Sequence, residues 1–130
     1  MRMSLKREKL LSYLCAQLNG FFPDGNLVKP EHIENSFDYI LKRVEYCFSH
    51  VNNKYFRSGG KAVFNHLNGD QYAMFLYFAA NTVYKDTQQV ELATKIFLLN
   101  KYLHGIDAFY EVELPDIFVF VHPLGTVLGR

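Results

Sequence analysis

The residues best suited to chemistry in this chain gather between positions 102 and 113. This short segment contains the following side chains of interest: His104, Asp107, Tyr110, Glu111 and Glu113. A histidine beside a carboxylate can be oriented and made more basic, which is the arrangement that activates a hydroxyl by general-base catalysis. The segment could therefore hold a small polar or cationic substrate, with His104 and Asp107 as its candidate binding residues.

A further candidate is Asp70, which follows Asn68 and Gly69. Asp70 and the pair His104 and Asp107 all lie at expected helix boundaries, where a rigid scaffold meets loops and binding groups often occur. The alternative for each boundary is structural, because such residues also serve as helix caps and turns. We expect Asp70, His104 and Asp107 to bind substrate, and we assign no catalytic residue within the chain.

Metal and phosphate chemistry are not favoured by the spacing of the residues that could support them. No two of the five histidines have the separation of three or four residues that places metal ligands on one helical face. Cys15 and Cys47 lack Cys-x-x-Cys spacing and are expected to be buried, reduced thiols. Gly60 is followed by Lys61 and Ala62, so the hydroxyl residue of a phosphate-binding loop is missing.

The composition predicts one globular domain and excludes several partners. Hydrophobic residues make up 49% of the 130 residues and charged residues 21%. A net charge of +1 with scattered basic residues argues against nucleic acid binding. The chain has no long apolar run and no signal peptide, so we expect a cytoplasmic protein without a membrane partner. Aromatic residues reach 16%, and we expect some of them to face a partner subunit.

Four helices that would position these residues are predicted by apolar residues at spacings of three and four. They cover residues 4–18, 30–48, 72–84 and 87–103. The third is apolar nearly all round, which is typical of a central helix. Asn68 is the expected cap of that helix, Gly105 closes the fourth, and the polar stretch 51–61 is expected to be a surface loop.

Beyond Ile106 the apolar period changes from helical to extended. Apolar residues alternate up to Val121, and His122 and Pro123 are followed by small residues and glycines. We therefore predict a mainly α fold, with a helical domain of four to five helices at 1–108 and an extended segment at 109–130. The extended segment has the pattern of a first structural repeat. Because repeats need several stacked copies, we expect the working half to follow Arg130.

Three features together resemble one enzyme family. They are the helical half, the aromatic helix after Asp70, and the sequence V-F-V-H-P-L-G-T-V-L-G at 119–129. They are similar to the N-terminal half of bacterial serine O-acetyltransferases, which belong to the hexapeptide-repeat acyltransferases. In that family an aliphatic run and a His-Pro pair begin a left-handed parallel β-helix. The resemblance implies that the segment 109–130 forms the first turn of such a β-helix.

The resemblance also implies a function, which is transfer of the acetyl group of acetyl-CoA to a hydroxyl of a small acceptor such as serine or a sugar. The family's catalytic histidine lies in a later repeat, so this chain is expected to be inactive alone. Asp70 is the counterpart of the family's substrate aspartate, although Gln71 stands where a proline usually follows. His122 corresponds to a structural histidine.

The family forms trimers that pair through their helical ends, which implies a homo-oligomer, either a trimer or a dimer of trimers. The alternative is a non-catalytic helical protein that acts in oligomerisation or in partner binding through its aromatic face.

Overall fold

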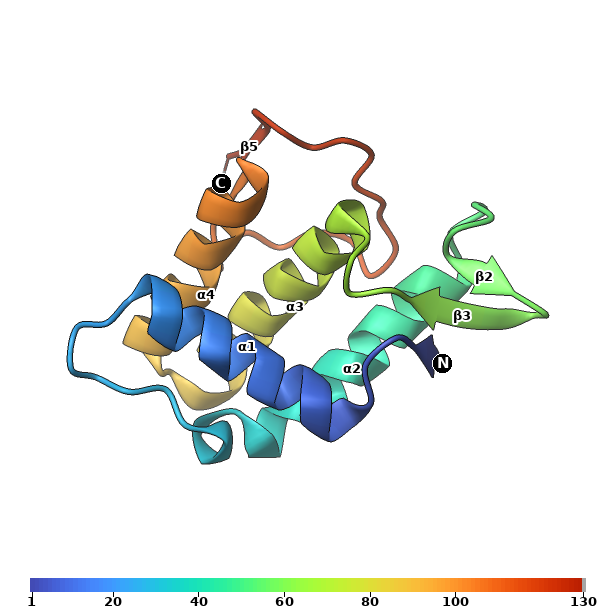
Figure 1. Ribbon diagram of the computed structural model, residues 1–130. Helices are drawn as coiled ribbons and strands as arrows, with labels where there is room; N and C mark the ends of the chain where they lie inside the picture. The colour runs from blue at the N-terminus through green and yellow to red at the C-terminus, as the bar shows by residue number, and fades with distance from the viewer. Residues whose placement is uncertain (130) are drawn as a thin grey trace.

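Four α-helices form most of the computed structural model, which describes residues 1–129 (Figure 1). They are α1 (Arg7–Phe21), α2 (Glu34–Ser49), α3 (Gly69–Thr87) and α4 (Val90–His104). Every residue of α3 from 71 to 83 is buried, and α3 packs against both α2 and α4. The prediction of a mainly helical domain around this central helix is confirmed. Within residues 1–129, no helix is long and apolar enough to cross a bilayer.

The first helix runs further than its sequence suggests. The predicted helix ends at residue 18, just before Asn19 and Gly20, but α1 continues to Phe21. The Asn19 side chain accepts a hydrogen bond from the Val28 amide (2.8 Å) and donates one to the Val28 carbonyl (2.9 Å). Asn19 therefore holds the following loop against the helix instead of ending it. The second predicted helix is also divided, because Pro30–His32 forms a separate 3-10 turn before α2.

The stretch predicted as a surface loop contains a β-hairpin. Strand β2 (Arg57–Ser58) pairs antiparallel with β3 (Lys61–Phe64), and β1 (Arg2–Met3) adds a parallel strand to β3. Gly59 and Gly60 connect β2 and β3 with φ of 58° and 78°. A tight hairpin with positive φ at both central residues favours glycine at both, so this pair was the local signal for a hairpin.

The predicted caps of the central helices are partly confirmed. The Asn68 side chain accepts a hydrogen bond from the Gln71 amide (3.2 Å) at the start of α3, and Gly105 ends α4 with φ of 63°. Thr87 does not begin the fourth helix, because its hydroxyl donates to the Val83 carbonyl (2.6 Å) and it belongs to the last turn of α3. Gln88, with φ of 58°, separates the two helices.

The C-terminal segment returns over the helices, as the red trace in Figure 1 shows. Strand β4 (Asp107–Ala108) pairs parallel with β5 (Val127–Leu128), which joins residues on both sides of the boundary expected at residue 108. Between these strands the chain is irregular and buries Tyr110, Val112 and Phe120. Within residues 109–129 the structure has no further strand, so continuation into a β-helix stays a prediction.

Most of the aromatic residues lie in the core or pack against it, and that some of the exposed ones face a partner subunit stays a prediction. The largest fully buried side chains include one tyrosine and five phenylalanines: Tyr77, Phe37, Phe48, Phe64, Phe75 and Phe78. Phe37 from α2 meets Phe75 from α3 edge to face, with ring centroids 6.2 Å apart. Because large rings fill the space between helices efficiently, one small core accommodates more of them than the composition suggested.

Candidate functional site

Asp70 lies in the first turn of α3, where the positive end of the helix dipole stabilises a carboxylate. Its side chain is half-buried, and its Oδ1 accepts a hydrogen bond from the backbone amide of His122 (3.2 Å). His122 has a φ of 49°, which places it in the left-handed region. The candidate substrate aspartate therefore contacts the His-Pro pair of the C-terminal segment.

A hollow of about 480 Å³ opens beside Asp70. Its walls come from the turn before the hairpin, the start of α3 and the C-terminal segment. The lining residues include Tyr55, Asn68, Asp70, Phe120, Val121 and His122. A volume of this size fits a small ligand, and the carboxylate of Asp70 is the charged group in its wall. The hollow can therefore accept a small cationic or hydroxylated molecule.

His104, in the last turn of α4, is held in one orientation by α4 itself. Asn100 donates from Nδ2 to the Ala73 carbonyl (3.0 Å), so its Oδ1 is directed toward His104 Nδ1 (2.8 Å). An amide oxygen can only accept, which places the hydrogen of the neutral imidazole on Nδ1. The lone pair of Nε2 is then available to accept a hydrogen bond, for example from a hydroxyl.

Asp70 and His104 influence each other across the start of α3. Burial lowers the pKa of His104 below its ordinary value, and the negative charge of Asp70 opposes this effect only in part. The two helix ends lie close together, because a Cβ atom added at Gly69 would be 3.8 Å from Cδ2 of His104. The structure thus places two of the three predicted binding residues in one region and keeps His104 neutral near pH 7.

The other members of the 102–113 cluster do not converge with His104. The carboxylate of Asp107 pairs with Lys101 (3.4 Å), and its amide donates to the Thr126 carbonyl (2.8 Å). Glu111 accepts from the Tyr84 hydroxyl (3.1 Å), while Glu113 pairs with Lys85 (3.1 Å). Asp107 therefore lies outside the hollow and ties β4 to its neighbours.

Gln71 has a structural role that the sequence alone did not indicate. Its side chain is fully buried and accepts from the Asn65 amide (2.7 Å). It donates to the carbonyls of Tyr55 (2.9 Å) and Val63 (3.1 Å). These bonds fasten the hairpin to the start of α3 and shape the hollow beside Asp70. A proline, the usual residue after this aspartate in the similar family, could make none of them.

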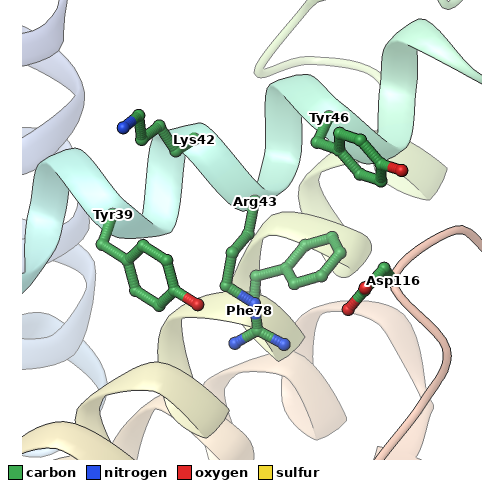
Figure 2. A pocket seen from close by; sticks show the side chains of 6 residues that line it. All are labelled: Tyr39, Lys42, Arg43, Tyr46, Phe78 and Asp116. Atoms are coloured by element: carbon green, nitrogen blue, oxygen red, sulfur yellow. The ribbon is translucent and has the colours of Figure 1, made fainter.

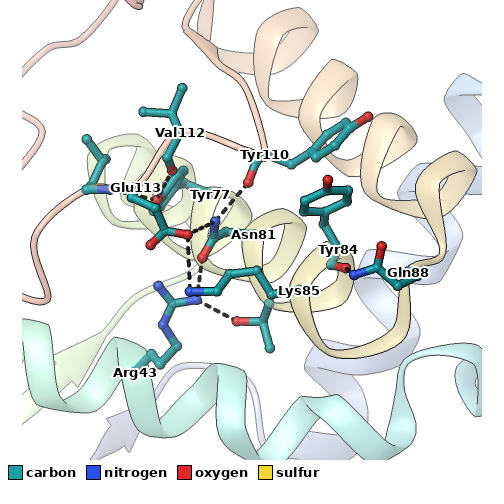
Figure 3. Close-up of polar contacts among 11 residues, drawn as sticks. Arg43, Tyr77, Asn81, Tyr84, Lys85, Gln88, Tyr110, Val112 and Glu113 are labelled. Carbon is teal, nitrogen blue, oxygen red and sulfur yellow. Dashed lines mark hydrogen bonds and ion pairs between the residues drawn. The ribbon is translucent and has the colours of Figure 1, made fainter. Parts of the chain in front are cut away.

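A buried polar network centred on Asn81 was also missed (Figure 3). Asn81 donates to the Tyr110 carbonyl (2.8 Å) and to Glu113 Oε1 (3.4 Å), and accepts from Arg43 Nη1 (2.9 Å). It is fully buried in the middle of α3. An asparagine at the centre of an otherwise apolar helix was the signal that could have found it, since a buried amide requires partners.

Glu113 is held in its ionised form by this network. Burial acts to raise its pKa, but hydrogen bonds from Lys85 and Asn81 and the charges of Lys85 and Arg43 more than offset that effect. The pKa of Glu113 therefore lies below its usual value. The C-terminal segment is thus fixed to α3 by charged as well as neutral hydrogen bonds.

Cys15 and Cys47 are free thiols in the core, as their spacing predicted. Cys47 Sγ donates to the Phe118 carbonyl (3.1 Å), which holds the C-terminal segment against α2. Burial raises the pKa of Cys15 to about 11, so this thiol stays protonated. Within the described part of the chain, no group of three or more His, Cys, Asp or Glu side chains is placed to hold a metal ion.

Comparison of the chain with protein-family models, with curated proteins and with solved structures gives no match.

Proposed function

We propose that this chain is the helical part of an O-acetyltransferase similar to the serine acetyltransferases. The reaction is transfer of the acetyl group of acetyl-CoA to a hydroxyl of a small acceptor, such as serine or a sugar. One observation carries the proposal: Asp70, the counterpart of the substrate aspartate, lines a hollow and contacts the backbone of His122. The His-Pro pair is where the β-helix is expected to begin.

The chemistry of the region supports an acceptor site. The carboxylate of Asp70 can bind an ammonium group, such as that of an amino acid acceptor. His104 is neutral near pH 7 and can accept a hydrogen bond at Nε2. Acetyl-CoA supplies the acetyl group and is expected to bind at the later repeats, together with the catalytic histidine, so no residue in 1–129 is assigned to either.

The test uses the protein that the whole coding sequence specifies, including any residues after Arg130. Acetyl-CoA turnover is measured by thiol release with serine and with a panel of sugars. The Asp70→Asn variant is expected to raise the acceptor KM about tenfold, because a charge-assisted hydrogen bond is worth roughly 1.5–3 kcal/mol. Asp86→Asn, which changes an exposed carboxylate of the same helix, is the matched control and should leave KM unchanged.

An absence of thiol release with every acceptor, or a KM that is the same for Asp70→Asn and Asp86→Asn, would remove the assignment of Asp70. A downstream sequence that lacks hexapeptide periods would contradict the enzyme family.

The second candidate function is partner binding without catalysis, and one feature of the C-terminal segment favours it. Ile117, Val119 and Val121 are exposed, whereas Phe118 and Phe120 between them turn inward. This exposed row of Ile117, Val119 and Val121 belongs to extended chain that pairs with no strand of residues 1–129. An unpaired apolar edge of this kind favours association with another chain. The proposed homo-oligomer would use the same surface.

A further inference from the structure

Arg43 forms no salt bridge within the described chain, although its charge acts on the nearby carboxylate of Glu113. Its Nη1 donates to Asn81 Oδ1 (2.9 Å) and Thr82 Oγ1 (2.7 Å), which are neutral acceptors. Its guanidinium also lies over the Phe78 ring, 4.8 Å from the centroid. Within residues 1–129, no carboxylate lies at salt-bridge distance from Arg43. The guanidinium is thus held rigidly and remains available to an anion.

A pocket of about 350 Å³ lies beside this guanidinium (Figure 2). Its walls are formed by one face of α2, by α3 and by the C-terminal segment, and its lining residues are Tyr39, Lys42, Arg43, Tyr46, Phe78 and Asp116. Arg43 follows Tyr39 by four residues and precedes Tyr46 by three, so all three side chains share one side of the helix. Two tyrosine rings therefore flank the charge, whereas the ammonium group of Lys42 points away from Arg43 (Figure 2).

Asp116 stands across this pocket from Arg43, as Figure 2 shows. The nearby bonds between Cys47 and Phe118 hold the segment that carries it against α2. Asp116 forms no salt bridge within the described chain, and it lines the same pocket as Arg43. A simple anion would bind Arg43 and be repelled by Asp116.

A ligand that carries one negative and one positive charge can pair with Arg43 on one wall and with Asp116 on the other. We infer that this pocket binds a free α-amino acid with an apolar or aromatic side chain. The carboxylate pairs with Arg43, which is suited to planar anions, the ammonium pairs with Asp116, and the side chain packs against a flanking tyrosine ring.

This amino-acid pocket shares no lining residue with the hollow beside Asp70. It is therefore a second site, and it does not depend on the proposed acetyl transfer.

Binding is tested by NMR titration of the chain with L-phenylalanine, and with two probes that each lack one charge. Phenylacetate lacks the ammonium and phenethylamine lacks the carboxylate. Phenylalanine is expected to shift signals of Tyr39, Arg43 and Asp116. It should bind up to about fivefold more tightly than either probe, which is the upper range for one exposed ion pair. Equal binding of phenylalanine and phenylacetate, or no binding, would overturn the inference.

Two substitutions locate the site. Arg43→Gln should weaken phenylalanine binding about fivefold, since it removes the ion pair with the carboxylate. Arg43 also bonds to α3, so Asp116→Asn provides a test that leaves the core intact: it should weaken phenylalanine about fivefold without weakening phenylacetate. Asp86→Asn is the control and should bind phenylalanine as the unaltered chain does. Unchanged binding in Asp116→Asn, or equal loss of binding in Asp86→Asn, would place the amino acid elsewhere and refute the assignment.

Discussion

Single buried polar side chains decide much of how this chain is joined together. Gln71, Asn81 and Asn100 each lie inside the core and each bonds to backbone that is distant in sequence. Their partners belong to the hairpin, the C-terminal segment and α3. Each amide would cost free energy if buried alone, so the segments that satisfy it are held in place with a specific geometry.

The first prediction concerns the pH dependence that His104 contributes. Its pKa is lowered in the folded chain, chiefly by burial, so the folded state binds this proton less well than the unfolded state. Its contribution to stability is complete above a pH of about 6.5, the ordinary histidine pKa, and is lost as the pH falls through the lower folded pKa.

Urea unfolding of the unaltered chain and of His104→Gln across this range measures the effect. The stability of the unaltered chain should fall more steeply with acid than that of the variant. Parallel pH profiles would contradict the lowered pKa, and an NMR titration of the imidazole gives an independent value.

The second prediction concerns Asn81. Asn81→Leu should lower the free energy of unfolding by about 2–4 kcal/mol, because it leaves the buried Tyr110 carbonyl without its donor and removes one of the two neutral acceptors of Arg43. Urea denaturation measures the change. Asn35→Ala, at an exposed position of α2, is the control and should stay within about 0.5 kcal/mol. Equal effects of the two substitutions would mean that the network does not hold the C-terminal segment in place.

At the scale of elements, helix interiors were predictable and helix ends were only partly so. The apolar spacing of each helix is a local property of the sequence, and all four were predicted. The position of a helix end depends on which of several competing hydrogen bonds a side chain forms. Asn19 bonds across the loop to Val28, and Thr87 bonds back into α3, so neither acts where its residue type suggested.

The third prediction compares two glycines at the ends of α1 and α4. Gly105 has a φ of 63°, and an added Cβ would also meet the Leu124 side chain, so Gly105→Ala should destabilise by about 1–2 kcal/mol. Gly20 lies inside α1 with open space around it, so Gly20→Ala should stabilise by up to about 1 kcal/mol. Thermal unfolding of both variants measures the difference, and the same sign for both would contradict the two backbone assignments.

At the scale of the whole molecule, the C-terminal segment completes the helical core. It is fixed by Asn81, by Cys47 and by Tyr77, whose hydroxyl donates to the Val112 carbonyl and accepts from the Leu114 amide. With one side of this segment buried, its outer side presents the exposed row of Ile117, Val119 and Val121. This row faces away from the core. Both the proposed homo-oligomer of the acetyltransferase and the alternative of partner binding would use it as a contact surface.

The fourth prediction tests this surface as the site of self-association. The chain is expected to form an oligomer, and Val119→Lys should convert it to a monomer by placing a charge in the exposed row. Leu67→Lys, at a highly exposed apolar position outside that row, is the control and should leave the assembly unchanged. Size-exclusion chromatography with light scattering measures both. A monomeric unaltered chain at high concentration would refute the proposed oligomer.

The sequence by itself determined the helical class, the central place of α3, the caps at Asn68 and Gly105 and the reduced state of the two cysteines. Those features follow from apolar periodicity, local backbone preference and residue spacing. All three depend on residues that are close together in the sequence. The sequence also placed Asp70 at a helix start, where the structure finds it beside the hollow.

Only the tertiary structure decided which of the candidate residues meet. Asp70 and His104 lie in one region at the start of α3, whereas Asp107 turns to Lys101, although it lies only three residues from His104. The network around Asn81 and the pocket beside Arg43 join α2, α3 and the C-terminal segment. Their partners are 29 or more residues apart in the chain. Such contacts arise from the packing of complete elements, and no spacing rule along the chain encodes them.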